Sequence, residues 1–243
     1  MIRFALTLAL LMTVPAAAQP APAPPRAGFA LVVLKKDWEQ LHLGYAGGPA
    51  LAQLRTVALD DALFTAEAGD LEEYRWASST AVLTPAATAR LMDALAGSGP
   101  RAEGIRRLSA LKGKLGHGNE LDRALYTRAF VVLLGGERLY GGIFLDPPSQ
   151  MAIGFPVARA AAEDGRCVIH FLPVHLPFFD VDPVGDGGAK GAGGTPDGGE
   201  VPKGMTEHFR NAAMEPTAVE HRKLLRDARL RAWLERAGKL KER

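Results

Sequence analysis

Two adjacent carboxylates beside aromatic residues are the first groups in the sequence that could do chemistry. Glu72 and Glu73 lie in the run LEEYRW, next to Tyr74, Arg75 and Trp76. Hydrolysis of a glycosidic bond needs two carboxylates that flank the bond. Alternation along a strand puts Glu72 with Tyr74 and Trp76 on one face and Glu73 with Arg75 on the other. These two candidate catalytic carboxylates would therefore not face the same bond.

The same run supplies the candidate binding residues. Tyr74, Trp76 and Arg75 are these candidates, and an exported protein would have glycans within reach. A hydrolase would have to take its second acid from elsewhere, for example from Asp60 or Asp61. The alternative interpretation is structural, with the aromatic rings in the core and the carboxylates at the rim of a sheet.

His170 and His175, followed by Asp180 and Asp182, form the candidate metal-ligating group. Imidazole and carboxylate are ordinary zinc ligands, and a catalytic zinc site needs three of them and an open position. Prolines interrupt this segment, so no regular element aims the four side chains at one point. The sequence therefore favours no metal and no cofactor, with structural histidines.

The single cysteine, Cys167, lies in the apolar run CVIHFL. A thiol in a buried strand behaves as a small apolar group, and His170, three residues away on a strand, would face the opposite side. The sequence has no GxSxG turn, and the glycine-rich run 185–200 lacks the order of a phosphate-binding loop. A buried, unreactive thiol is the prediction.

The N-terminus indicates where the protein works. Residues 1–18 combine a positive charge at Arg3, a short apolar run and a small-residue exit, which is the layout of a signal peptide. Its apolar run is too short to span a bilayer. Residues 19–27 form a Pro/Ala-rich linker, whose composition favours an extended conformation. We expect a periplasmic or secreted bacterial protein, in which a lone cysteine forms no intrachain disulfide.

Residues 28–182 are predicted to form a single α+β domain. The expected fold is an antiparallel sheet of about four to five strands backed by one or two helices. The helix 85–96 is clearest, because Thr84 can cap it, Pro85 suits its first position and Gly97 can end it. Six ranges read as strands or strand candidates: 29–34, 71–76, 129–134, 138–145, 152–157 and 168–172.

The C-terminal part is predicted to lie outside this domain. Residues 183–204 are a flexible Gly-rich linker, and residues 205–243 are a basic tail with ten lysines and arginines against six acidic residues. A capping box at Thr217 and an uninterrupted run predict one basic helix over 217–237. Such a helix could dock on its own domain, on a partner or on a membrane surface.

These features favour a non-enzymatic binding or protein-interaction module of the cell envelope, with an envelope protein or glycan as partner. A hydrolase of glycan or ester bonds and a protein held on the membrane surface through residues 217–237 are the alternatives. The net charge of +2 and the compartment argue against a nucleic acid as partner.

Overall fold

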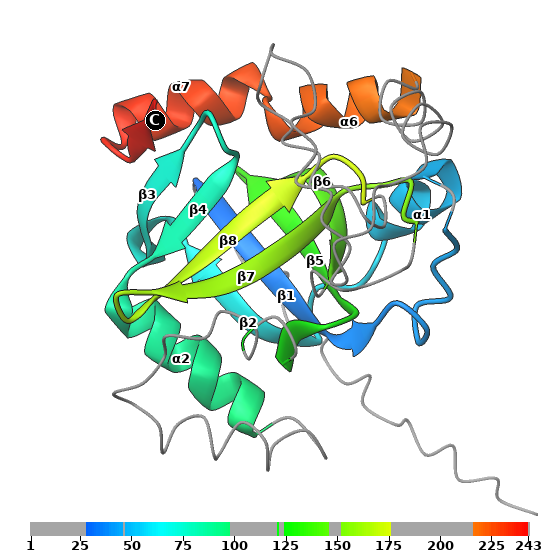
Figure 1. Ribbon diagram of the computed structural model, residues 1–243, viewed down its shortest axis with the longest axis horizontal. Coiled ribbons are helices and arrows are strands. Elements are labelled where there is room, and N and C mark those ends of the chain that lie inside the picture. Colours follow the sequence, from blue (N-terminus) through cyan, green and yellow to red (C-terminus); the bar gives the residue numbers. More distant parts are fainter. Residues whose placement is uncertain are drawn as a thin grey trace, which may run out of the picture.

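One curled, mixed sheet of nine strands dominates the computed structural model, which describes residues 28–45, 47–97, 121, 124–145, 152–175 and 216–242 (Figure 1). The strand order is β2-β1-β5-β6-β7-β8-β4-β3-β9. The strands are β1 (Phe29–Asp37), β2 (Ala62–Glu67), β3 (Leu71–Arg75), β4 (Thr80–Leu83), β5 (Arg128–Leu134), β6 (Glu137–Phe144), β7 (Val157–Glu163), β8 (Arg166–Leu172) and β9 (Leu240–Lys241). The helices are α1 (Gly47–Leu54), the short 3-10 helix η1 (Ala68–Asp70), α2 (Pro85–Ala96), α6 (Pro216–Leu225) and α7 (Ala228–Arg236).

The predicted fold class is wrong in both the size and the type of the sheet. The sheet has nine strands rather than four or five, and it is mixed, because β6 pairs with β7 and β3 pairs with β9 in parallel. Strand β7 escaped prediction because VARAAAE is rich in alanine, which carries little strand propensity. The expected strand 152–157 contributes only an isolated bridge between Ile153 and His175 before β7 begins.

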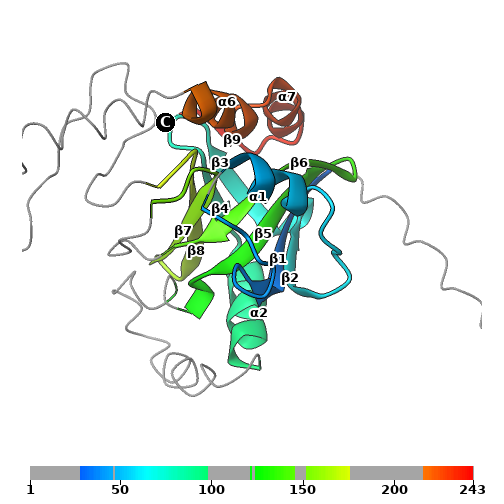
Figure 2. The same cartoon turned by 90° about the vertical axis from the view of Figure 1, so that its right-hand side faces the viewer.

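The sheet must curl because of one short connection. Strands β2 and β3 lie near opposite ends of the strand order, yet the three residues of η1 join them directly. Three residues span about 10 Å at most, so the two ends of the sheet come close together. Figure 2 shows the resulting arrangement, with the strands wrapped around a shared interior.

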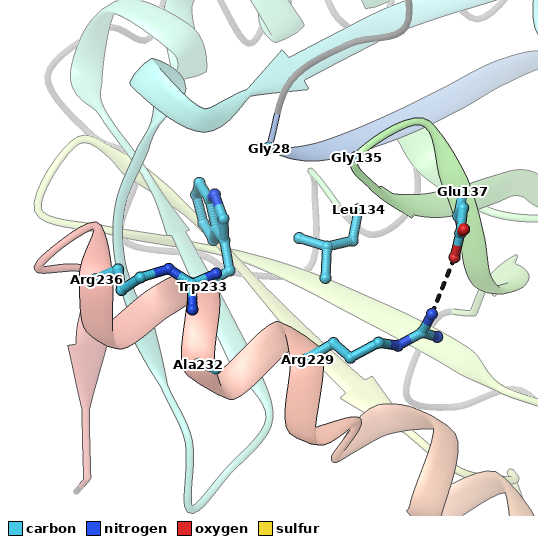
Figure 3. Close-up of a pocket in the computed structure, with 8 residues that line it drawn as sticks. All are labelled: Gly28, Leu134, Gly135, Glu137, Arg229, Ala232, Trp233 and Arg236. Atoms are coloured by element: carbon cyan, nitrogen blue, oxygen red, sulfur yellow. Dashed lines mark hydrogen bonds and ion pairs between the residues drawn. The ribbon is translucent and has the colours of Figure 1, made fainter.

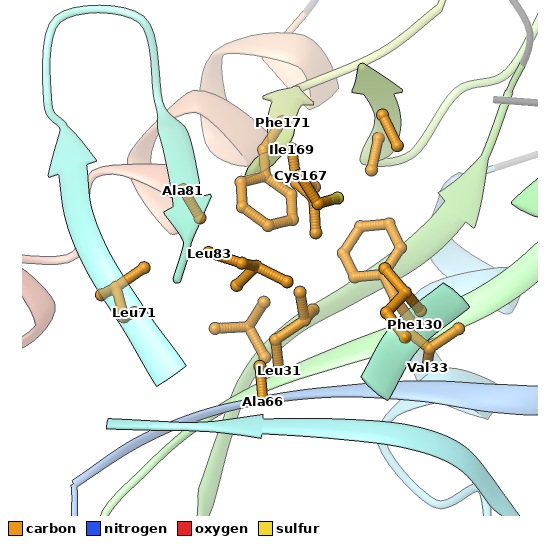
Figure 4. Packing of buried hydrophobic residues seen from close by; sticks show 14 of the residues in the cluster. Leu31, Val33, Ala66, Leu71, Ala81, Leu83, Phe130, Cys167, Ile169 and Phe171 are labelled. Carbon is orange, nitrogen blue, oxygen red and sulfur yellow. The ribbon is translucent and has the colours of Figure 1, made fainter. Parts of the chain in front are cut away.

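The interior of the curl holds the main hydrophobic core. Side chains from β1 to β8 point into it, and Figure 4 shows Leu31, Phe130, Ile169 and Phe171 from three strands meeting there. Phe130 packs with ring centroids 5.3 Å from Phe144 and 5.5 Å from Phe171. Burial of these large apolar groups is the dominant stabilising contribution. We call this set the inner cluster.

A second hydrophobic cluster lies on the opposite face of β1, β5 and β6. Alternate residues of β1, such as Ala30, Val32 and Leu34, enter this outer cluster, and α1 covers it with Ala50 and Leu54. These strands are buried on both faces, which explains why β1 and β5 are continuous apolar runs rather than alternating ones.

Two helices close opposite ends of the curl. Helix α2 contributes Ala87, Leu91 and Leu95 to the inner cluster at one end, and α7 contributes Leu230 and Leu234 at the other. Figure 1 shows α2 at the bottom and α7 at the top of the sheet. The α2 range matches the prediction, and the Thr84 hydroxyl accepts a hydrogen bond from Ala87 N as a cap.

The predicted single helix 217–237 is two helices. The chain breaks at Arg226 and Asp227, and the Asp227 carboxylate caps α7 by accepting from Arg229 N at 2.8 Å. The tail then adds β9, in which Lys239 O and Lys241 O accept hydrogen bonds from Tyr74 N and Trp76 N of the β3 edge. The tail therefore docks on the sheet through side chains and through backbone.

The predicted signal peptide 1–18 and the predicted linkers 19–27 and 183–204 lie outside the described residues. Within the described segments, no helix has the length and apolar character needed to cross a bilayer.

Candidate functional site

The two candidate catalytic carboxylates, Glu72 and Glu73, are both held by arginines outside the inner cluster. The pairing of β3 with β4 slips between Leu71 and Glu73, so alternation breaks and Leu71 joins Tyr74 in the core. Glu72 accepts from Arg166 at 2.7 Å, and Glu73 accepts from Arg75 Nε at 2.8 Å. Arg75 also donates to Glu163. The Glu72–Arg166 pair joins β3 to β8, the Glu73–Arg75 pair lies within β3, and Arg75 links β3 to β7 through Glu163.

The candidate binding residues of the same strand are divided between core and surface. Tyr74 is fully buried, and burial raises the pKa of its phenol and of the nearby Tyr140 phenol. Trp76 packs at the edge of the inner cluster, with its ring centroid 6.1 Å from that of Tyr74. The Arg231 guanidinium of α7 lies 5.6 Å over the Trp76 ring. These aromatic rings pack in and against the inner cluster and thereby support the fold.

The candidate metal ligands His170 and His175 have other partners. His170 Nδ1 lies 3.0 Å from the Thr80 hydroxyl of the neighbouring strand. His175 is buried and exchanges two backbone hydrogen bonds with Ile153. Asp180 and Asp182 fall outside the described residues. Among the residues that are described, no three histidine, cysteine or acidic side chains gather as a metal site would require.

The buried thiol of Cys167 is confirmed. It lies in the inner cluster on β8, and its backbone N donates to the Thr88 hydroxyl of α2 at 2.8 Å. This contact attaches α2 to the sheet.

The described surface has a groove between α7 and the turn that joins β5 to β6. Figure 3 shows the side chains that line it, with Trp233 pointing toward the start of β1. The hollow has a volume of about 500 Å³. We call it the α7 groove, and its lining residues are Gly28, Leu134, Gly135, Glu137, Arg229, Ala232, Trp233 and Arg236.

Trp233 forms the apolar wall of the α7 groove. Its ring stacks on Phe29 of the inner cluster with centroids 6.0 Å apart and an interplanar angle of 24°. Gly28 makes this position possible, because a Cβ there would lie 3.2 Å from the indole Nε1 and because its φ of +97° favours glycine. The indole is thus held by packing before any ligand arrives, and Leu134 and Ala232 extend the apolar surface.

The rim of the α7 groove is cationic. Arg229 donates to Glu137 at 2.9 Å and to Asp227 at 2.9 Å, which fixes its guanidinium. The hydrogen bonds from Arg229 hold the pKa of Asp227 below its ordinary value. Arg236 is exposed and has no hydrogen-bonded or ion-paired partner among the described residues. One guanidinium next to the indole therefore faces solvent unpaired within the described chain.

A second hollow of about 440 Å³ lies at the α2 end of the sheet. This α2 groove is lined by Lys35, Leu63, Asp93, Ala94, Gly97 and Arg128. Its cations have partners, since Lys35 pairs with Asp61 at 3.2 Å and Arg128 donates to the Lys35 carbonyl at 2.7 Å.

The α7 end also contains a buried histidine. His221 of α6 is 2% exposed, and a Cβ added to Gly47 at the start of α1 would lie 3.1 Å from its ring. Burial lowers the pKa of His221, against the opposing effects of the Pro173 carbonyl and Glu220. Nδ1 has no hydrogen-bond partner in the described part of the chain. The buried position of His221 therefore favours the neutral form of its ring.

Sequence reasoning missed the α7 groove, because its walls come from three distant parts of the chain. Gly28, Leu134 and Trp233 are more than 90 residues apart along the sequence. The only local signal was the basic helix with a tryptophan, which gave no indication of the partner surface. Comparison with protein-family models, curated proteins and solved structures found no match.

Proposed function

We propose that this protein is an exported, non-enzymatic binding module of the bacterial cell envelope, and that the α7 groove is its binding surface. The observation that carries the proposal is the pairing of a preorganised indole, Trp233, with the exposed guanidinium of Arg236 at one hollow. Binding sites combine apolar area with a few placed polar groups, and tryptophan and arginine are the residues most enriched at such contacts.

The environment of the candidate carboxylates supports binding over hydrolysis. Glu72 and Glu73 each accept a hydrogen bond from an arginine, and the Glu72–Arg166 pair joins two strands of the sheet. A hydrolase that used them would first have to separate them from Arg166 and Arg75. The two-carboxylate mechanism also requires a cleft between the acids, and the α7 groove has the single carboxylate Glu137.

The docking of the tail supports a groove rather than a membrane as the contact made by residues 217–237. A helix that lies on a membrane inserts its apolar face among the lipids. In α7 the corresponding residues, Leu230 and Leu234, are fully buried in the inner cluster. On α7, a ligand can contact the basic side chains and the edge of the Trp233 ring.

Export is the part of the proposal that rests on the N-terminal sequence. Residues 1–18 have the charge, apolar run and small-residue exit of a signal peptide. An exported module would meet envelope proteins and glycans, which are the partners proposed for it.

The indole signals of the protein provide a direct test. The three tryptophans, Trp38, Trp76 and Trp233, give three indole N–H resonances that Trp→Phe variants assign. The probes are acidic peptides, peptidoglycan-derived glycan fragments and vesicles of anionic lipid. We expect at least one probe to shift the Trp233 resonance and to leave Trp38, which packs against the outer cluster, unchanged.

Two variants locate the contact. Ala232→Glu fills the α7 groove, and Ala94→Glu makes the same change in the α2 groove. Binding should be lost in the first and retained in the second. A probe that still binds the Ala232 variant, or one that is released as hydrolysis products, would contradict the proposal.

A further inference from the structure

We infer that the ligand of the α7 groove is an acidic peptide segment that carries one large apolar side chain beside its carboxylates. This inference rests on the proposed function and names the class of ligand. It follows from the charge around the groove, its apolar floor and the absence of hydroxyl or amide side chains among its described lining residues.

Charge is the first argument. Residues 216–242 carry eight lysines and arginines against four acidic residues. Glu137, the only acid among the described residues that line the groove, is paired with Arg229. Arg236 has no partner among the described residues, while Arg231 is paired with Glu235 and Glu242. A carboxylate is the group that a free guanidinium binds with two parallel hydrogen bonds.

The floor of the groove is the second argument. Trp233, Leu134 and Ala232 supply apolar surface of the size that one leucine or phenylalanine side chain covers. Because Trp233 is already stacked on Phe29, binding of a ligand costs little free energy for ordering the indole.

The type of polar group separates a peptide from a glycan. A sugar presents many hydroxyls, which need amide, carboxylate or hydroxyl partners around the stacked ring. Among the described residues, the lining of the α7 groove contains arginines and one paired glutamate, and no serine, threonine, asparagine or glutamine. An acidic peptide uses both the guanidinium and the apolar floor.

A binding titration tests this inference. The probe is the fluorescein-labelled peptide Gly-Glu-Glu-Phe-Glu-Glu-Gly, followed by fluorescence anisotropy with the purified protein. Two matched peptides replace Phe by Gly or every Glu by Lys. We expect the first peptide to bind best and the lysine peptide not to bind. Raising NaCl from about 0.05 M to about 0.5 M should weaken binding, because the added ions screen the attraction between the exposed Arg236 guanidinium and the carboxylates of the peptide.

Arg236→Glu is the decisive variant, and Lys36→Glu is its control. Lys36 is exposed at the other end of β1 from Gly28, about 26 Å away along the strand. Both variants change the net charge equally. The Kd should rise about tenfold or more for Arg236→Glu, which is the size expected for a lost charge-assisted hydrogen bond, and stay within about twofold for Lys36→Glu.

The possible outcomes separate the two proposals. Equal affinity of the Arg236 and Lys36 variants overturns the acidic-peptide inference. Failure of all three peptides to bind, while a glycan fragment or anionic vesicle still shifts Trp233, overturns the peptide class and leaves the groove as the binding surface. A Trp233 signal that responds to no probe of any class overturns both.

Discussion

The α7 groove and the α2 groove are hollows of similar size at opposite ends of one curled sheet, about 500 and 440 Å³. Each forms where a helix covers an end of the curl. In the α2 groove both cations bond to their own neighbours and no aromatic side chain is present. In the α7 groove an indole is exposed at the wall and Arg236 faces solvent. The helix-covered ends of the sheet thus produce both grooves, and the two grooves differ in the side chains that line them.

The largest expected effect tests whether α7 belongs to the core as fully as α2 does. Leu234→Ala in α7 and Leu91→Ala in α2 each truncate a completely buried leucine of the inner cluster. Both should lower the free energy of unfolding by about 2–5 kcal/mol, since each loses apolar burial and leaves a cavity. Urea denaturation measures the loss. A cost below about 1 kcal/mol for Leu234→Ala alone would show that α7 is only loosely attached.

The glycine that supports the groove wall provides the second test. Gly28→Ala imposes a strained φ of +97° and puts a Cβ 3.2 Å from Trp233. Gly165→Ala also imposes a strained φ, of +77°, but its Cβ would lie in open space. Left-handed strain costs about 1–2 kcal/mol in each case. The Gly28 variant should lose additional stability and shift the Trp233 indole resonance. Equal losses in both variants, without a shift, would show that Gly28 does not position the indole.

The two ends should also respond differently to pH. His221 is buried near α7, and its folded-state pKa lies below the ordinary 6.5, so folding favours the neutral ring. This contribution is complete above pH 6.5 and is lost as the pH falls, by at most about 1.4 kcal/mol per pH unit. Hydrogen-exchange protection factors, which are corrected for the intrinsic pH dependence of exchange, should therefore fall in α6 and α7 before they fall in α2 as the pH drops below 6.5. In the His221→Gln variant, protection in α6 and α7 should change with pH in the same way as protection in α2. If the difference between the two ends persists in this variant, another titrating group causes it.

The smallest expected effect compares the two helix caps. Asp227→Ala removes the α7 cap and Thr84→Ala removes the α2 cap. Each should cost about 1 kcal/mol in the free energy of unfolding. The Asp227 variant should lose more at low salt, because it also releases Arg229. Thermal unfolding at two salt concentrations distinguishes the cases, and an identical salt response would contradict a role for the Asp227–Arg229 pair.

Features with a complete local signal were predicted correctly from the sequence. Thr84, Pro85 and Gly97 delimit α2 without help from the rest of the chain, and this range agrees with the structure. Gly135 and Gly136, between the predicted strands 129–134 and 138–145, are an equally local turn signal, and both have the positive φ that such a turn needs.

Features that depend on distant contacts were not predicted. A slip in the pairing of β3 with β4 placed Leu71 and Tyr74 on one side, and no residue pattern in LEEYRW shows it. The break at Asp227 arises although the run contains no glycine or proline, because α7 must turn to bury Leu230 and Leu234. The α7 groove needs Gly28, Leu134 and Trp233 together, and only tertiary structure brings them into contact.

Pairing of β9 with β3 has a consequence for the order of events in folding. Residues 240 and 241 bond to a strand made from residues 71–75, so this edge of the sheet is unfinished until the last part of the chain is available. Contacts so distant in sequence form slowly, because a long loop must close first. A chain that emerges with its N-terminus first therefore completes its nine-stranded sheet only after residue 241 has become available.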